Sequence, residues 1–213
     1  PGYQRKDFKL TEDKFIFCSF NNTMKLNPQM FDTWIEILKS VDNSVLWIYC
    51  NNKDAVKNLT QYAKAKTLDT TRLIFTEMIE YEKHLARLKL ADLFLDCFPF
   101  GAGTTASDAL FAGLPIVTLQ GESFASRMAA SLLKTAKVPE LVTDTFEDYK
   151  KLAIDIAQNP EKLRNLKSRI LDPESRRELF DTKRYVNNLE KAYKQIVARH
   201  HAGLPPDHIY IEL

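Results

Sequence analysis

The stretch LADLFLDCFPFGAGTTASDAL, residues 90–110, carries the signal from which the fold can be read. A strongly apolar run ends near Phe98, a turn with two glycines follows, and the next residues have the composition of a helix. At such a strand-to-helix junction, the free amides of the first helical turn point toward whatever lies above the loop. The stretch therefore predicts an anion site at this junction.

The polar residues of the loop match the parts of a nucleotide. Gly101 and Gly103 permit close approach of the backbone to a ligand. Thr104 and Thr105 offer hydroxyl donors, and with the helix amides they would form a cradle for a phosphate or diphosphate. Asp108 lies about one turn into the helix, where its carboxylate would accept hydrogen bonds from ribose hydroxyls. The alternative, a glycine turn whose threonines only cap a helix, stays open because short glycine patterns are weak evidence.

The composition is that of an ordinary globular protein. Of the 213 residues, 45% are hydrophobic and 27% are charged, which suits one large domain or two small ones. The 30 basic and 28 acidic residues give a net charge of +2, so a nucleic-acid partner is not expected. The sequence has no run of about 18 apolar residues and no signal-peptide pattern, so we expect a cytoplasmic protein without a membrane partner.

The cysteines and the first residue bear on the origin of the chain. Cys18, Cys50 and Cys97 have no paired spacing and lie in apolar runs, which indicates buried thiols in a reducing compartment. The chain begins with Pro1 rather than Met, which indicates a segment of a longer protein.

Short apolar runs alternate with amphipathic stretches along most of the chain. The runs are rich in β-branched and aromatic residues and apolar on both faces, as expected of strands inside a parallel sheet. We predict strands at 14–20, 44–50, 72–78, 91–98 and 114–119. We predict helices at 30–41, 53–66, 80–90, 106–113, 123–136, 145–158, 161–171 and 181–200. With right-handed crossovers, this alternation gives a doubly wound α/β sheet.

Ligands of doubly wound sheets bind outside the carboxyl ends of the strands, so the loops that follow strands form the candidate site. Lys25 follows the first predicted strand, where its ammonium would either reach the same anion or remain a solvated surface charge. His84 and Arg87 share a helix face and would bind a base edge or a phosphate, or serve a structural role. No cluster of His, Cys, Asp or Glu has metal-ligand spacing, so no metal is expected.

Three segments resemble a known family. They are FCSFNNTMKLNP (17–28), LADLFLDCFPFGAGTTASDALFAGLPIVTLQGESFASRMAAS (90–131) and FDTKRYVNNLEKAY (180–193). They look like the C-terminal half of the catalytic region of O-linked N-acetylglucosamine (O-GlcNAc) transferases, especially bacterial members attached to tetratricopeptide repeats. The resemblance covers nearly all of the chain. It implies the C-terminal half of a GT-B glycosyltransferase, whose Rossmann-like domain binds the UDP-sugar.

The resemblance assigns diphosphate and ribose contacts to matching positions. Lys25 matches the lysine that neutralises the diphosphate and helps UDP leave, which makes it the expected catalytic residue. Asn22 stands where many members have a glutamine near the diphosphate. Thr104 and Thr105 match paired threonines on the phosphates, and Asp108 matches the carboxylate that binds the ribose.

At the uridine end, His84 and Arg87 match a histidine and an arginine, and the backbone of Ile79 falls where a contact to uracil is expected. Two positions depart from the animal members. Gly103 stands where they have a histidine beside the nucleotide, and Tyr81 stands where they have a lysine. Nucleotide contacts at these two positions must therefore differ.

The implied reaction is inverting, metal-independent transfer of GlcNAc from UDP-GlcNAc to a Ser or Thr of a protein. No cofactor is expected, because helix amides, threonines and a lysine can stabilise the leaving diphosphate. The acceptor-recognising regions precede this segment, so we expect the chain alone to bind UDP or UDP-GlcNAc but to turn over little. The alternatives are a GT-B transferase that uses another UDP-hexose or an Asn acceptor, and a non-catalytic nucleotide-binding or scaffold module.

The chain divides into two expected parts, a UDP-sugar-binding domain at 1–180 and a C-terminal helix with its tail at 181–213. Apolar positions of the helix recur at helical spacing and form one stripe. These positions are Tyr185, Leu189, Ala192, Tyr193, Ile196 and Val197. We expect the stripe to pack back on the domain, on a preceding N-terminal domain, or in a homodimer.

Overall fold

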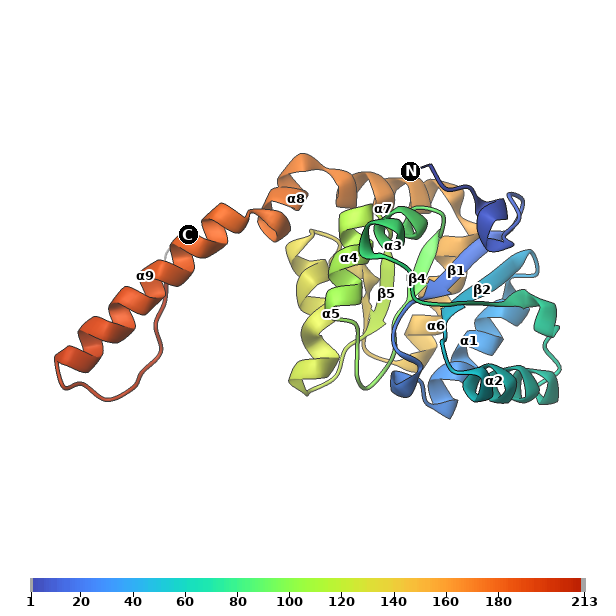
Figure 1. The fold of residues 1–213 in the computed structure, drawn as a ribbon, viewed down its shortest axis with the longest axis horizontal. Coiled ribbons are helices and arrows are strands. Elements are labelled where there is room, and N and C mark those ends of the chain that lie inside the picture. The colour runs from blue at the N-terminus through green and yellow to red at the C-terminus, as the bar shows by residue number, and fades with distance from the viewer. Residues whose placement is uncertain (1, 212–213) are drawn as a thin grey trace.

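Residues 2–211 are described by a computed structural model, and they contain a six-stranded parallel sheet flanked by helices (Figure 1). The strand order is β3-β2-β1-β4-β5-β6, and every pair of neighbours is parallel. The strands are β1 (Phe15–Ser19), β2 (Ser44–Tyr49), β3 (Leu73–Thr76), β4 (Leu93–Leu95), β5 (Ile116–Leu119) and β6 (Val142–Thr143). The predicted Rossmann-like, doubly wound α/β fold is therefore confirmed.

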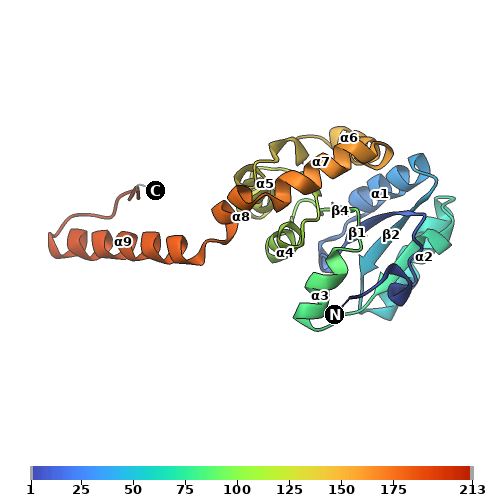
Figure 2. The same cartoon turned by 90° about the horizontal axis from the view of Figure 1, so that it is seen from above.

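Every helix predicted from the sequence is present, with bounds that differ by at most two residues. The α-helices are α1 (Pro28–Ser40), α2 (Lys53–Ala65), α3 (Tyr81–Leu88), α4 (Thr104–Ala112), α5 (Phe124–Thr135), α6 (Phe146–Gln158), α7 (Pro160–Leu171), α8 (Pro173–Phe180) and α9 (Thr182–His201). Helices α1, α6 and α7 lie on one side of the sheet and α3 on the other (Figure 2). Among the α-helices and strands, α8 and β6 were not predicted. Strand β6 has only two residues, and α8 (PESRRELF) has large apolar residues only in its last two positions, so neither shows a periodic pattern.

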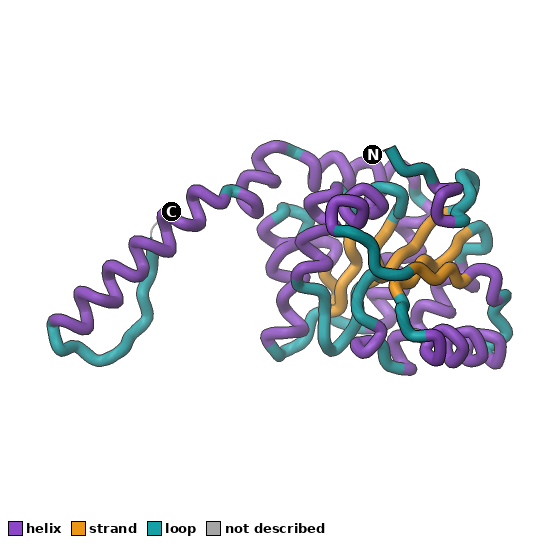
Figure 3. Tube along the Cα trace, viewed as in Figure 1, coloured by secondary structure: helices purple, strands orange, loops and turns teal. Residues whose placement is uncertain are grey.

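The sheet forms the centre of the hydrophobic core. Ile16, Phe17 and Cys18 of β1 are completely buried, so both faces of this central strand are covered. Helices surround the strands in the tube view (Figure 3). Burial on both faces explains why the strands read as continuous apolar runs rather than as alternating patterns.

Asparagine side chains begin two of the helices, as their position before proline predicts. Asn27 Oδ1 accepts a hydrogen bond from the amide of Met30 at 2.9 Å, and Pro28 occupies the first helical position. Asn159 Oδ1 accepts a bond from the amide of Lys162 at 3.1 Å in the same way. These caps satisfy amides that the helix itself leaves unpaired.

The three cysteines are buried free thiols, as expected from their apolar surroundings. Burial raises the pKa of Cys97 to about 12 and that of Cys18 well above its usual value. Both thiols are therefore protonated at neutral pH and unreactive. Across residues 2–211, no helix combines the length and the apolar character needed to cross a membrane.

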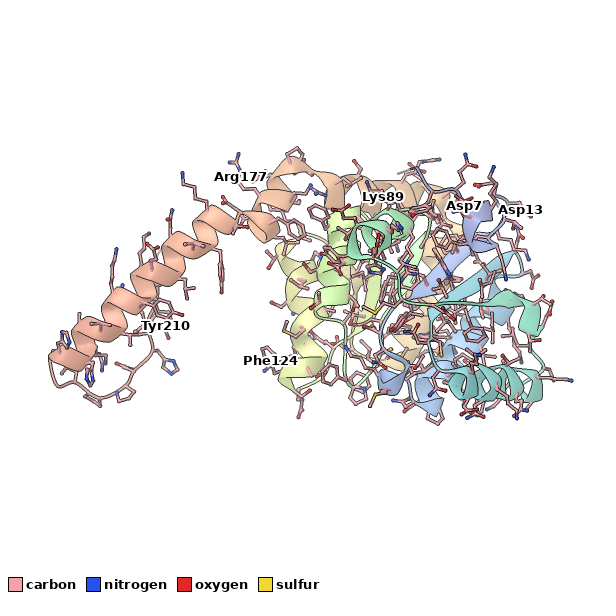
Figure 4. The ribbon with its side chains drawn as sticks, viewed as in Figure 1. Asp7, Asp13, Lys89, Phe124, Arg177 and Tyr210 are labelled. Atoms are coloured by element: carbon pink, nitrogen blue, oxygen red, sulfur yellow. The ribbon has the colours of Figure 1, made fainter. Side chains whose placement is uncertain are left out.

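The helix α9 projects from the body of the protein (Figure 1), and none of its residues is buried. Tyr185, Tyr193 and Ile196 of the predicted stripe are 66%, 58% and 50% exposed. After the helix the chain turns back beside it, and Tyr210 of this returning segment is labelled in Figure 4. These three positions of the stripe are thus largely uncovered within residues 2–211, and packing of the stripe on the domain, on a preceding domain or in a dimer stays a prediction.

Candidate functional site

The site lies where the sheet changes its winding direction, between β1 and β4. In doubly wound sheets, the loops that follow the two strands at such a point diverge and leave a crevice. Here the two loops are tied together by hydrogen bonds from the first loop to the second. Asn27 Nδ2 donates to the carbonyl of Phe98 at 2.7 Å, and Lys25 Nζ donates to the carbonyl of Gly101 at 3.0 Å.

A buried carboxylate, Asp96, fixes the shape of the second loop. Its Oδ1 accepts hydrogen bonds from the amides of Cys97 and Ala102 at 2.7 and 2.8 Å. Its Oδ2 accepts one from the hydroxyl of Thr118 on β5 at 2.7 Å. Burial raises the pKa of Asp96, while these hydrogen bonds act in the opposite direction. The carboxylate therefore holds the backbone turn that leads into α4.

Asn21 connects Asp96 to Thr105 at the start of α4. Its Nδ2 donates to Asp96 Oδ1 at 2.9 Å, and its Oδ1 accepts the hydroxyl hydrogen of Thr105 at 2.7 Å. Both Asn21 and Asp96 are buried. This connection was not predicted from the sequence, because neither Asn21 nor Asp96 belongs to a recognisable motif.

The start of α4 has the form expected of an anion cradle. Gly103 occupies the cap position and offers no side chain to the first amides, while its carbonyl accepts bonds from Ala106 and Ser107 at 3.1 and 3.0 Å. Helix geometry leaves the amides of Thr104 and Thr105 without a partner inside the helix. Thr104 is exposed and Thr105 is half-buried, so both threonines are accessible from the crevice.

The two loop glycines differ in the space around them. A Cβ atom at Gly101 would lie 3.1 Å from Asp96 Oδ2 and 3.3 Å from the carbonyl of Ala125. A Cβ atom at Gly103 would meet only Met128 Cε, at 3.8 Å. Gly101 is therefore required by close packing, whereas the fold leaves room for a side chain at position 103.

Lys25 reaches the glycine loop from the loop after β1. It ends a short 3₁₀ helix, Thr23–Lys25, and its ammonium lies 4.3 Å from the centre of the Phe100 ring. The structure thus brings Lys25, Thr104 and Thr105 to one edge of the sheet. Asn22 is exposed, and its Oδ1 caps the 3₁₀ helix by accepting from the amide of Met24 at 3.0 Å.

A pocket of about 320 Å³ lies beside the cradle. Its lining includes Phe20, Ile79, Tyr81, His84, Arg87 and Thr105. Three of the residues expected at the uridine end, Ile79, His84 and Arg87, are therefore brought together with Thr105. The lining has the composition of a site that could bind a nucleotide base, since it offers aromatic surfaces beside a few polar groups.

Arg87 and His84 form the polar end of this pocket. Arg87 Nε donates to His84 Nδ1 at 3.0 Å, and Arg87 Nη1 donates to the carbonyl of Glu77 at 2.9 Å. The guanidinium also lies 4.7 Å from the centre of the Phe20 ring. Burial lowers the pKa of Arg87 to about 10, and burial together with the nearby Arg87 charge lowers the pKa of His84. His84 is therefore neutral at pH 7, with its proton on Nε2.

Asp108 lies on α4 and is 8% exposed. Its Oδ1 accepts a hydrogen bond from the hydroxyl of Tyr81 at 2.7 Å, which links α4 to the first residue of α3. Within the described residues, 2–211, no group of three or more His, Cys, Asp or Glu side chains is placed to hold a metal ion.

Comparison with known proteins decides the family. Residues 3–189 match the model of glycosyl transferase family 41. The chain belongs to glycosyl transferase family 41. This family 41 chain is 34% identical over 205 residues to the UDP-N-acetylglucosamine--peptide N-acetylglucosaminyltransferase of Caenorhabditis elegans, covering 96% of the chain and 18% of the relative. It is 36% identical over 209 residues to the probable enzyme SEC of Arabidopsis thaliana, covering 98% of the chain and 21% of the relative.

The family 41 chain thus spans about a fifth of the length of these two curated relatives. Among solved structures it superimposes on a mutant of the O-GlcNAc transferase of Thermobaculum terrenum with a TM-score of 0.81 and 26% identity, covering 87% of this chain and 36% of that one. The Anabaena protein HepE, solved with UDP and glucose, gives a TM-score of 0.62 at 14% identity over 89% of this chain and 55% of that one, a likeness of fold alone. The resemblance read from the sequence, to the C-terminal catalytic region of O-GlcNAc transferases, is confirmed.

Proposed function

We propose that this chain is the donor-binding half of a protein O-GlcNAc transferase and that it binds UDP-GlcNAc at the β1/β4 crevice. The observation that carries the proposal is the convergence of Lys25, the free amides of α4 and the paired threonines beside a nucleoside-sized pocket. The names of the relatives support the sugar and the protein acceptor.

The diphosphate would bind at the start of α4. The unpaired amides and the positive end of the helix dipole favour an anion there, and Thr104 adds a hydroxyl donor. The hydroxyl hydrogen of Thr105 already points to Asn21 Oδ1. Thr105 would therefore contribute chiefly its amide.

Lys25 would supply the positive charge that the leaving diphosphate needs. Its ammonium rests on the carbonyl of Gly101 at 3.0 Å, within the loop that would hold the phosphates. As the bond from the anomeric carbon to the diphosphate breaks, negative charge develops on the leaving oxygen. A positioned cation and helix amides stabilise that charge more than the ground state, which lowers the barrier.

The nucleoside would occupy the pocket between α3 and α4. Neutral His84 offers its Nε2 hydrogen to a base carbonyl, and the Phe20 ring beside it offers an apolar surface. Arg87 is largely committed to Thr76, Glu77 and His84, so it acts chiefly by fixing the imidazole. Asp108 would accept hydrogen bonds from the ribose.

The acceptor side of the reaction falls outside these residues. We propose a metal-independent, inverting displacement in which a Ser or Thr hydroxyl attacks the anomeric carbon from the side opposite the diphosphate. The base and the acceptor-binding surface would come from regions that precede this chain in its relatives. The chain alone should therefore bind donor and transfer sugar slowly or not at all, in the cytoplasm where the thiols stay reduced.

Calorimetric titration with UDP, with ADP and GDP as controls and EDTA present, tests the proposal. We expect selective UDP binding that Lys25→Ala weakens while uridine binding is unchanged. Equal affinity for the three nucleotides, or binding only after a divalent metal is added back, would contradict it. Supplying the preceding regions as a second polypeptide and following sugar transfer to a Ser/Thr peptide would test the acceptor, with UDP-glucose as the competing donor.

A further inference from the structure

Phe100 is an aromatic side chain on the glycine loop that contributes little to the hydrophobic core. It lies between β4 and α4, directly before Gly101, and is 55% exposed. The ammonium of Lys25 lies 4.3 Å from the centre of its ring. A cation within about 6 Å of a ring centre is attracted to the aromatic face. The ring of Phe100 therefore holds Lys25 rather than the core.

The ammonium of Lys25 has no negatively charged partner among residues 2–211. None of the ion pairs within this part of the chain includes Lys25. Its Nζ donates one hydrogen bond, to the carbonyl of Gly101 at 3.0 Å. Because an ammonium has three hydrogens, two remain for a ligand.

An aromatic ring can orient a lysine without cancelling its charge. A carboxylate at the position of the ring would also fix the ammonium, but it would neutralise the charge and repel a diphosphate. The face of a phenylalanine ring attracts a cation through its quadrupole and carries no net charge. The contact with Phe100 thus leaves the full positive charge of Lys25 available to an anion.

We infer that Phe100 is a positioning residue for Lys25, whose ring holds the ammonium at the glycine loop before the diphosphate binds. This inference rests on the proposed function and deepens it, since it explains how the cation at the leaving group is prepared. A lysine side chain has much rotamer entropy to lose, and a contact that orders it in advance lowers the cost of binding.

The test is a double-mutant cycle of Phe100→Leu and Lys25→Met, followed by calorimetry with UDP and with uridine. Leucine keeps an apolar side chain at this position but has no aromatic face. We expect Phe100→Leu to weaken UDP binding about 2- to 5-fold, the range of an exposed cation–π contact, and to leave uridine binding unchanged. In the Lys25→Met background the same substitution should have no further effect.

Two variants serve as controls. Phe100→Tyr keeps the aromatic face and should bind UDP as tightly as the parent chain. Phe124 begins α5, is labelled in Figure 4 and is 75% exposed. Among residues 2–211, none of the cation–π contacts involves Phe124. Phe124→Leu therefore removes another exposed ring and should leave UDP affinity unchanged.

Equal or tighter UDP binding by Phe100→Leu would overturn the inference. An equal loss in the Lys25→Met background would also overturn it, because the ring would then act without the lysine. If the parent chain binds no UDP, the proposed function fails and the inference with it. If UDP binding depends on Lys25 but not on Phe100, only the inference fails.

Discussion

Two adjacent asparagines, Asn21 and Asn22, offer a sharp test of how the anion cradle is held. Asn21 is buried and bonds to both Asp96 and Thr105. Asn22 is exposed and bonds only to the amide of Met24. Replacing each with alanine removes the same atoms from neighbouring positions of one loop, so the pair forms its own control.

The expected cost of Asn21→Ala follows from its two hydrogen bonds. A bond to a buried carboxylate contributes about 1.5–3 kcal/mol and a neutral bond about 0.5–1.5 kcal/mol. The free energy of unfolding should therefore fall by about 2–4.5 kcal/mol. The start of α4 at Thr105 then loses its fixed position, and UDP affinity should fall about 2- to 13-fold, the equivalent of one hydrogen bond. Asn22→Ala removes one exposed cap and should cost about 0.5–1 kcal/mol.

Urea unfolding followed by circular dichroism measures the first effect, and calorimetry with UDP measures the second. With a slope of about 3 kcal/mol/M, the midpoint for Asn21→Ala should fall by about 1 M. Asn22→Ala should keep a midpoint close to that of the parent chain. If its side chain contacts the diphosphate, as the family resemblance implies, UDP affinity alone should fall.

Two results would refute this account of the cradle. An unchanged urea midpoint for Asn21→Ala would show that the buried bonds contribute no stability. A lowered midpoint with full UDP affinity would show that Asn21 stabilises the fold but is not needed to position the Thr105 amide for the phosphate.

Three further predictions concern charge, space and pH. Lys25→Ala should weaken UDP binding about 10- to 150-fold while leaving uridine binding unchanged in calorimetry, and Lys25→Met should behave alike if the charge rather than the stem matters. Gly101→Ala should cost about 1–3 kcal/mol in urea unfolding because its Cβ would crowd Asp96, whereas Gly103→Ala should stay within about 0.5 kcal/mol. The pKa of His84 is lowered from 6.5, so the contribution of the neutral imidazole to stability is complete above pH 6.5 and is lost as the pH falls through the lowered pKa. The urea midpoint of the parent chain should therefore drop on acidification more than that of His84→Gln. Equal drops in the two proteins would contradict this.

Much of the fold could be predicted because the physical signals are local. Each long helix has its own apolar period, and Asn27 and Asn159 mark two starts before proline. The strands of a parallel sheet are apolar on both faces, which separates them from surface strands. The strand order could not be read in this way, because it depends on pairing between segments that lie far apart in the sequence.

The arrangement of the candidate site residues could be predicted in part for the same reason. The glycines and hydroxyls at the start of α4 form a pattern within a few residues of sequence. The general geometry of parallel sheets predicts that Lys25 lies near them. The hydrogen bond between Asn21 and Asp96 joins residues 75 positions apart in the sequence, and neither residue belongs to a recognisable motif. The contact between Tyr81 and Asp108 could not be predicted from the sequence either, since it depends on how closely α3 approaches α4.

Because helix α9 projects from the body, the overall shape of the molecule should change when another protein or domain binds this helix. A 20-residue helix is about 30 Å long, close to the diameter of a small domain. A particle with such an arm scatters X-rays as an elongated body and sediments more slowly than a sphere of equal mass. If another domain covered the arm, the outline would become more compact even as the mass rose. Small-angle scattering can therefore test whether another domain or a second copy of the chain covers α9, without any label on the chain.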